Sequence, residues 1–390
     1  MIKDLASLLA PLPERIFLDH FLAKKRLHLK AADPERACPL LPWGVINRLI
    51  ESDRQTPSAF LLRRDGTLVP TAMYCRAGTR DRVRASGLHA LLAQGASIVI
   101  DHIDELVPEI GQLGGSLERR LGCTVWINAY LTFGNGSALK PHHDTHDVLI
   151  LQVHGRKRWR SFGSSTPVPI GPSRRGTRYD TVAWEDWLEP GDALYLPRGE
   201  AHEAIAEQHN SAHLTIGMQP QRGVDLFEWL ADKAAAQELF RADLPRQEPG
   251  SSLSAFEAQL KQRMHALVDE LNLVDFLAAD DQRRAPQTLV NLNIADHPVA
   301  SAVIMPTPRR RMPLATDRKG AAELLIGGET HRLSSNARRV LSHLLDHDAQ
   351  ACGAVVAAFG STMGEEQVRD AVQELVAHGL AAVRPLSDRS

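Results

Sequence analysis

The stretch Pro141–Trp159, PHHDTHDVLILQVHGRKRW, decides the fold of this chain. It begins with His142, His143 and Asp144, continues as the apolar run Val148–Val153, and ends in a turn followed by basic residues. Successive side chains of a strand point to opposite faces, so we expect His142 and Asp144 to share one face and His143 to point away. An imidazole and a carboxylate spaced in this way can bind one metal ion from the same side.

A third ligand for this ion is expected from Gly191–Ala204, GDALYLPRGEAHEA, which carries His202. An antiparallel barrel brings strands that are distant in the sequence side by side, so His202 can approach the first two residues. Two histidines and one carboxylate on one face of an ion, with the other positions open, are typical of a non-haem Fe(II) oxygenase. An HxD triplet alone is more often a surface pair, and His202 is the feature that favours a metal site.

Lys157 follows the His154–Gly155 turn, so we expect its strand to run antiparallel to the strand that precedes the turn. A lysine that points into a barrel needs an anionic partner, because an unpaired buried cation is costly. A dicarboxylate whose other end binds the metal would be such a partner. The alternative is that Lys157 points outward between Arg156 and Arg158, as part of an ordinary basic turn.

The segment Thr124–Thr132, TVWINAYLT, is predicted to be a strand with two different faces. One face carries Trp126, Asn128 and Tyr130, as expected at the mouth of a barrel, and the other face is apolar. Asn128 and Tyr130 can both donate hydrogen bonds to a ligand. His213 and Thr215 share a face of a later strand and are further candidates for the pocket wall. The sequence leaves two interpretations of His146 and Asp147: they line the mouth, or they begin the strand.

Short segments of strand character, separated by turns, run from about residue 96 to residue 218. The predicted strands are Ala96–Ile100, Thr124–Thr132, Val148–Val153, Lys157–Arg160, Ala193–Leu196 and Ala212–Met218. Their density and their Gly- and Pro-rich connections favour a double-sheet β barrel of jelly-roll type. An amphipathic helix over Leu106–Leu121 makes the fold class α+β.

After Gln221 the pattern becomes helical. Helices are predicted over Phe227–Phe240 and Ala255–Phe276, the second opening with a capping box of Ser254 and Glu257. Possible strands at Thr288–Asn293 and Leu324–Gly327 follow. The tail, Ser334–Val383, contains three short helical segments and then a strand, in the order of a winged-helix fold. The predicted domains are therefore 1–221 (barrel with an N-terminal extension), 222–290 (helical segment) and 291–390 (winged helix).

Composition narrows the class of protein. The chain has 390 residues, 43% hydrophobic and 24% charged, with a formal net charge of −2, as is ordinary for a globular protein. The tail has more acidic than basic residues, which argues against direct nucleic-acid binding. Four cysteines lie far apart without a CxxC pair, and no apolar run reaches membrane-spanning length. We therefore expect a cytoplasmic protein with no membrane contact.

The quoted residues resemble the JmjC-type 2-oxoglutarate oxygenases, most closely the ribosomal oxygenase branch of the cupin superfamily. The matching text is NAY, PHHDTHDVLILQVHGRKRW, EPGDALYLPRGEAHEA and SAHLTIG. The resemblance implies that His142, Asp144 and His202 hold Fe(II). It also implies that Lys157 binds the far carboxylate of 2-oxoglutarate. It places Asn128 and Tyr130 beside the cosubstrate, and we expect Thr215 to join this site from its place on the later strand.

The same resemblance implies a helical dimerisation segment, a winged-helix domain, and hydroxylation of a protein with 2-oxoglutarate and O₂. The expected substrate is a ribosomal protein, and the expected assembly is a homodimer. Two alternatives stay open: a tailoring hydroxylase of peptides or small molecules on the same barrel, and a non-catalytic metal-binding cupin that acts as a scaffold. The sequence does not decide which residue is hydroxylated, or whether demethylation replaces hydroxylation.

Overall fold

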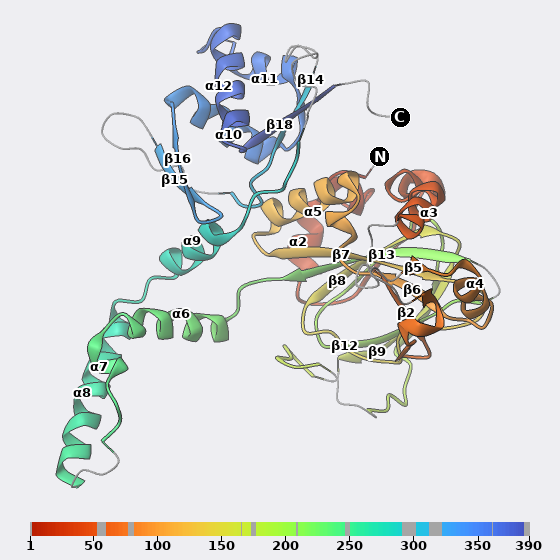
Figure 1. Ribbon diagram of the computed structural model, residues 1–390, viewed down its shortest axis with the longest axis horizontal. Helices are drawn as coiled ribbons and strands as arrows, with labels where there is room; N and C mark the ends of the chain where they lie inside the picture. Colours follow the sequence, from red (N-terminus) through yellow and green to blue (C-terminus); the bar gives the residue numbers. More distant parts are fainter. Residues whose placement is uncertain are drawn as a thin grey trace. The chain divides into compact units, whose positions relative to one another are not determined.

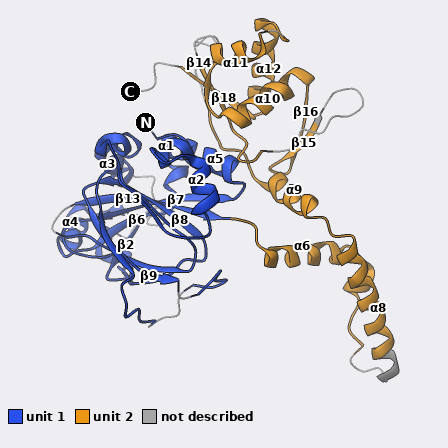
Figure 2. Ribbon diagram, turned by 180° about the vertical axis from the view of Figure 1, so that it is seen from behind, with its two compact units in different colours: residues 1–219 blue, residues 220–390 orange. Residues whose placement is uncertain are grey.

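The chain divides into two compact units, Met1–Gln219 and Pro220–Ser390 (Figure 2). The computed structural model describes residues 2–52, 60–76, 82–164, 166–172, 177–207, 210–245, 250–290, 302–311, 322–360 and 362–385. Within these residues, no helix is both long enough and apolar enough to cross a membrane.

The first unit contains a barrel of two antiparallel sheets (Figure 1). The larger sheet has the strand order β1-β11-β8-β13-β7-β6-β2-β3, and the smaller has the order β10-β9-β12. The strands of the larger sheet are β1 (Leu27–Leu29), β2 (Leu61–Arg64), β3 (Thr67–Leu68), β6 (Ser97–Ile100), β7 (Thr124–Thr132), β8 (Asp147–His154), β11 (Ala193–Leu196) and β13 (Ser211–Gln219). Those of the smaller sheet are β9 (Lys157–Ser164), β10 (Trp184–Leu188) and β12 (Glu200–Ile205). The prediction of a barrel built from two antiparallel sheets is confirmed.

Five helices precede β7 in the described part of the first unit, and residues of these helices share the main apolar core with the larger sheet. They are α1 (Leu5–Leu9), α2 (Glu14–His20), α3 (Trp43–Glu51), α4 (Ala85–Ala93) and α5 (Pro108–Leu121), with short 3₁₀ turns at η1 (Pro34–Leu40), η2 (Thr71–Met73) and η3 (Ile103–Glu105). A separate short ladder joins β4 (Cys75–Arg76) and β5 (Arg82–Val83). The main apolar core includes Leu8, Phe17 and Ile110 from the helices and Ile127 and Ile216 from the sheet.

The two faces of β7 differ as the sequence predicts. Val125, Ile127, Ala129 and Leu131 are buried in the main core, whereas Trp126, Asn128 and Tyr130 line a cavity inside the barrel. This alternation follows from the period of two along a strand. It means that the core packing of one face fixes which side chains are offered to the cavity on the other.

On the side of β7 that faces β6, the buried carboxylates of Asp104 and Glu118 accept backbone hydrogen bonds where β6 is not paired. The strand β6 pairs only with the second half of β7, from Ala129 to Thr132. Ahead of that point, the N–H of Ile127 donates to Asp104 Oδ1 (2.9 Å) and the N–H of Val125 donates to Glu118 Oε1 (3.1 Å). Charge-assisted bonds of this kind are stronger than neutral ones. They hold the start of the strand that carries the cavity-lining side chains.

The turn between β8 and β9 crosses from one sheet to the other. The two strands are not paired: β8 lies between β11 and β13, and β9 lies between β10 and β12. The prediction that the strand of Lys157 is an antiparallel neighbour of β8 is therefore wrong. Gly155 makes the crossing possible, because its φ is +57° and a Cβ there would collide with the carbonyl oxygen of Asn210.

The second unit begins with helices and ends in a small α/β part. The helices are α6 (Gly223–Ala235), α7 (Glu238–Arg241), α8 (Gly250–Asp269) and α9 (Leu273–Arg283). The later elements are β14 (Ala302–Pro306), β15 (Ala322–Ile326), β16 (Glu329–Leu333), α10 (Ser335–His347), β17 (Gln350–Ala351), α11 (Cys352–Phe359), α12 (Glu365–Ala377) and β18 (Ala381–Pro385). They form a β17-β14-β18 sheet, a β15-β16 hairpin, and an apolar core, with a smaller apolar cluster of Val303, Met305 and Ala382 beside it.

Several helix boundaries of the second unit differ from the predictions. The helix predicted over Ala255–Phe276 is two helices, because Asn272 caps α9 by accepting from the N–H of Val274 (2.8 Å). Ser254 lies inside α8, so the predicted capping box is wrong. The helix predicted over Phe227–Phe240 is α6 followed by α7. Of the possible strand Thr288–Asn293, residues 288–290 are irregular and the rest lie outside the described residues.

Candidate active site

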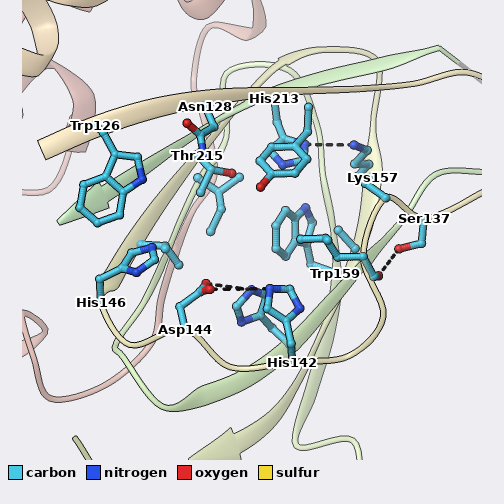
Figure 3. Close-up of a pocket in the computed structure, with 17 residues that line it drawn as sticks. Trp126, Asn128, Ser137, His142, Asp144, His146, Lys157, Trp159, His213 and Thr215 are labelled. Atoms are coloured by element: carbon cyan, nitrogen blue, oxygen red, sulfur yellow. Dashed lines mark hydrogen bonds and ion pairs between the residues drawn. The ribbon is translucent and has the colours of Figure 1, made fainter. Parts of the chain in front are cut away.

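A cavity of about 130 Å³ lies inside the barrel of the first unit (Figure 3). This is about ten times the roughly 10–15 Å³ that a single water molecule needs, so the cavity has room for a small ligand. Its walls come from both sheets and from the loop that precedes β8. All seven residues that the sequence assigns to the site line it: His142, Asp144, His202, Lys157, Asn128, Tyr130 and Thr215.

His142, Asp144 and His202 form a cluster at one end of the cavity. Their ligating atoms all lie within 4.8 Å of one another. The Nε2 atom of His142 is 3.7 Å from Asp144 Oδ1, and the Nε2 atom of His202 is 3.6 Å from Asp144 Oδ2. The three side chains that the sequence groups together are therefore adjacent in space.

The backbone that carries His142 and Asp144 is not a strand, which corrects one step of the sequence argument. The strand β8 begins only at Asp147, and the preceding residues form a loop. This loop is held to β12 by one bridge, in which His142 and His202 exchange two backbone hydrogen bonds of 3.1 and 2.8 Å. Strand periodicity thus did not bring the two ligands together; the bridge and the loop did.

Backbone carbonyls orient both imidazole rings. The Nδ1 atom of His142 lies 2.8 Å from the carbonyl oxygen of Lys140, and that of His202 lies 2.9 Å from the carbonyl oxygen of Glu200. A carbonyl only accepts, so each Nδ1 carries a proton, and Nε2 is the atom of each ring that is left to bind a metal ion. Burial, and then the nearby ring of His142, lower the pKa of His202, so that this ring is neutral at neutral pH. Neutral imidazoles with this tautomer are what a metal ion requires.

Lys157 lies in the cavity wall, and its side chain is buried. The residue is 2% exposed, and its Nζ lies 3.1 Å from His213 Nδ1, across the space between the two sheets. Burial lowers the pKa of Lys157 to about 7. Burial and the lysine together lower the pKa of His213 well below its usual value, so the neutral ring accepts from the ammonium. None of the ion pairs in the described part of the chain includes Lys157.

Hydrogen-bonding groups of β7 and β13 lie along the same wall. Thr215 pairs with Asn128 across the sheet, and His213 pairs with Tyr130, whose ring stacks on it at 5.2 Å. The Oδ1 atom of Asn128 accepts from the N–H of His102 (3.0 Å), which fixes the amide. Burial raises the pKa of Tyr130 to about 12, so its hydroxyl stays protonated and can donate.

Trp126 and His146, which the sequence offers as candidates for the mouth of the barrel and not for the metal or cosubstrate site, form an aromatic wall. Their rings lie 4.6 Å apart, and both line the cavity (Figure 3). Gly217 faces Trp126 in the neighbouring strand, and a Cβ there would overlap the indole ring. Trp126 could be found from its place on the polar face of β7. The sequence left open whether His146 and Asp147 line the mouth or begin the strand. His146 lines the cavity, and Asp147 begins β8.

Trp159 also lines the cavity, and its place two residues after Lys157 is the signal that could have identified it. Its ring lies 5.3 Å from that of His213 and 6.0 Å from that of His202. His143 is buried and does not line the cavity, as its predicted direction requires; its Nδ1 lies 3.4 Å from the hydroxyl of Tyr179.

Comparison with curated proteins gives partial matches. The bifunctional lysine-specific demethylase and histidyl-hydroxylase NO66 of Aedes aegypti is 27% identical over 242 residues, which are 60% of this chain and 38% of that protein. The protein of the same name from Drosophila willistoni is 33% identical over 135 residues, which are 33% of this chain and 18% of that protein. The chain thus spans less than two fifths of the length of these relatives.

Comparison with solved structures gives matches over nearly the whole chain. The X-ray structure of E. coli ycfD has a TM-score of 0.59 at 19% identity, covering 96% of this chain and 99% of that one. A structure of YcfD described as a ribosomal oxygenase from Escherichia coli, in complex with cobalt and 2-oxoglutarate, has a TM-score of 0.56 at 19% identity and the same coverage. At this identity the likeness is one of fold.

The model of the JmjC domain matches residues 106–226, which hold β7 to β13 and every residue of the His-Asp-His cluster. Residues 106–226 of this chain are therefore similar to the JmjC domain.

Proposed function

We propose that this chain is an Fe(II)- and 2-oxoglutarate-dependent oxygenase that hydroxylates a protein side chain. The observation that carries the proposal is the composition of one cavity. A cluster of two imidazoles and one carboxylate lies at one end, and the buried amine of Lys157 lies in the wall at the other. A ligand that bridges these groups needs a metal-binding end and an anionic end, and 2-oxoglutarate has both.

The donor set fits Fe(II). Two imidazoles and one carboxylate are the donor set of non-haem Fe(II) oxygenases, and a site of this kind would leave room for a cosubstrate and for O₂. When bound, the iron with 2-oxoglutarate and O₂ supplies the oxidising chemistry, in which 2-oxoglutarate becomes succinate and CO₂ and one oxygen atom is added to the substrate. His142, Asp144 and His202 would hold the iron.

The other residues of the chain bind, orient and exclude water. Lys157 would bind the far carboxylate as a cation, and the resulting pair compensates the cost of burying both charges. The amide of Asn128 and the hydroxyls of Tyr130 and Thr215 would donate to cosubstrate oxygens. Ile150, which is buried and also lines the cavity, provides an apolar surface that excludes water.

For the substrate we propose a ribosomal protein. The support is the fold shared with a protein described as a ribosomal oxygenase and the partial match to proteins named as histidyl-hydroxylases. The test is mass spectrometry of ribosomal proteins from cells with the gene, without it, and with the Asp144→Ala variant. A residue that gains one oxygen atom only in the presence of the intact gene is expected. Loss of a methyl group instead would assign demethylation.

Assays of 2-oxoglutarate turnover and metal binding on the purified chain distinguish two rival functions. A tailoring hydroxylase would turn over 2-oxoglutarate with a peptide or small molecule and not with ribosomal proteins. A non-catalytic scaffold would bind metal without any substrate-stimulated formation of succinate. The buried Lys157 favours the catalytic reading, since a scaffold has no use for a buried cation that faces the metal site.

For the rest of the chain we propose the domains 1–221, 222–290 and 291–390, with a winged-helix fold in the last. Residues 222–290 are the proposed dimerisation segment, because they expose large apolar side chains. Those exposed by 46% or more are Val224, Phe227, Leu244, Leu253, Met264, Val268, Leu273, Val274, Leu277 and Val290. Large exposed apolar patches mark interaction surfaces. All four cysteines are free, in keeping with the cytoplasmic location that we propose.

A further inference from the structure

The turn that leads into His202 is tied to the N-terminal segment by a partly buried ion pair. Arg26, just before β1, donates from Nη1 to Glu200 and to Ser161 Oγ (3.0 Å), and its guanidinium stacks on Trp184 at 5.0 Å. Ser161, Trp184 and Glu200 belong to β9, β10 and β12, which are the three strands of the smaller sheet. One arginine from the edge of the larger sheet therefore contacts every strand of the smaller one.

Glu200 is held from two sides. It is 6% exposed, and its Oε1 accepts from Ser161 Oγ (2.5 Å) as well as from Arg26. A buried carboxylate without a partner is strongly destabilising, so these two donors determine where the side chain can lie. The backbone carbonyl of the same residue accepts the Nδ1–H of His202 (2.9 Å). Fixing the side chain of Glu200 thus fixes the acceptor that orients a metal-binding ring.

The ladder between β9 and β12 is irregular where this happens. Ala201 pairs with Gly163, and His202 pairs with Ser161, so one residue of β9 is left over as a bulge. Bulges bend a strand and change the direction of a side chain. Ser161 lies at this bulge, where it faces His202 in the register and bonds Glu200 through its hydroxyl.

The same turn contacts the backbone of a second ligand. The N–H of Gly199 donates to the carbonyl oxygen of Asp144 (3.0 Å). The N–H of Arg198 donates to Asp147 Oδ1 (2.9 Å), at the start of β8. A shift of Glu200 would therefore reach both Asp144 and His202.

We propose that Arg26, Glu200 and Ser161 are positioning residues for the metal site, a role that rests on the metal binding proposed above. None of them touches the ion; they act through the carbonyl of Glu200 and the turn before it. Partners that orient ligating histidines typically contribute about 10–100-fold to metal affinity. A purely structural ion pair would change the stability of the chain and leave the affinity of the folded protein for metal unchanged.

The test measures metal affinity directly on the full chain. Co(II) is titrated against a chelator, with its visible absorption as the readout, for the wild type, Arg26→Gln and Glu200→Gln. Each variant is expected to bind Co(II) about 10–100-fold more weakly. The double variant is expected to be no weaker than the worse single one, because residues that act through one contact are not additive.

Arg160→Gln is the matched control. Arg160 bonds Glu203 (3.2 Å) across the same two strands, β9 and β12, and is paired with it in the register. Removing this arginine breaks its ion pairs with Glu203 and Glu185, and neither pair includes a side chain of the turn or of the metal cluster. Its affinity for Co(II) is expected to match that of the wild type.

The outcomes separate the two proposals. Unchanged Co(II) affinity in Arg26→Gln and Glu200→Gln, or an equal loss in the Arg160 control, overturns the positioning role. A wild-type chain that binds no Co(II) refutes the proposed function itself. If Arg26→Gln does not fold, Ser161→Ala decides, since it removes one hydroxyl and leaves the ion pair intact. Weaker Co(II) binding in this variant supports the role, and wild-type affinity overturns it.

Discussion

Replacing Lys157 by alanine tests the cosubstrate site most directly. The substitution removes the buried ammonium that lies 3.1 Å from His213 and that would bind the far carboxylate of 2-oxoglutarate. A hydrogen bond to a charged group contributes about 1.5–3 kcal/mol. This corresponds to roughly a tenfold to 150-fold rise in the dissociation constant for 2-oxoglutarate. Metal affinity is expected to stay the same, because Lys157 does not belong to the ligand cluster.

The assay is calorimetric titration of 2-oxoglutarate into the metal-loaded chain, alongside a separate metal titration of the same variant. A dissociation constant equal to that of the wild type would refute the reasoning and favour the non-catalytic cupin. Loss of metal binding in Lys157→Ala would also contradict it, since that result would mean that the side chain supports the ligands rather than the cosubstrate.

The pH dependence of binding gives a second check with a defined sign. Burial holds the pKa of Lys157 near 7, well below its usual 10.5. A bound carboxylate opposes this effect and raises the pKa again, so binding above pH 7 takes up a proton. The affinity for 2-oxoglutarate is therefore expected to be flat below pH 7. Above it, the affinity should fall by up to about tenfold per pH unit. Lys157→Arg keeps a permanent cation and is expected to lose this dependence.

Three further predictions follow from the site and the helical segment. Asp144→Ala is expected to abolish metal-dependent conversion of 2-oxoglutarate to succinate, and full turnover in this variant would exclude Asp144 as a ligand. The wild type is expected to have the mass of a dimer by light scattering at micromolar concentration, and Phe227→Glu that of a monomer. A monomeric wild type would contradict the assigned dimerisation segment. Gly217→Ala displaces Trp126, so it should lower the free energy of unfolding by about 1–3 kcal/mol in denaturant titration. A folded variant with wild-type stability would show that the indole is not held by this contact.

The sequence predicted the barrel and which side chains meet in its cavity, because both leave local patterns. The alternation in β7 identifies which of its residues face the cavity, since apolar and polar side chains must separate on a strand with one buried face. The residues His142, Asp144 and His202 were identified by side-chain chemistry, which does not depend on the backbone that carries them. This is why the cluster was predicted correctly although the strand assigned to its first two residues was wrong.

The parts that the sequence did not predict depend on contacts between distant segments. A two-residue turn after β8 looks like a hairpin, and nothing local shows that Gly155 instead carries the chain to the other sheet. The partner of Lys157, His213, lies on a strand that is distant in the sequence, so its hydrogen bond could not be inferred. Likewise, the break at Asn272 in a helix predicted to be continuous is set by a side-chain cap, which competes with helix propagation for the same residues.

The inward face of β9 links these observations. Lys157, Trp159 and Ser161 alternate along the strand and are all buried, whereas Arg158 and Arg160 between them bond to acidic residues such as Glu185. Lys157 reaches across the cavity to the larger sheet, Trp159 contacts the rings of His213 and His202, and Ser161 bonds Glu200 in the turn before His202. A shift of register by one residue would turn all three away from the cavity at once. The crossing at Gly155 therefore belongs to the proposed site, because the strand that follows it supplies the proposed cosubstrate contact, an aromatic ring of the cavity wall and a hydrogen bond to the turn before His202.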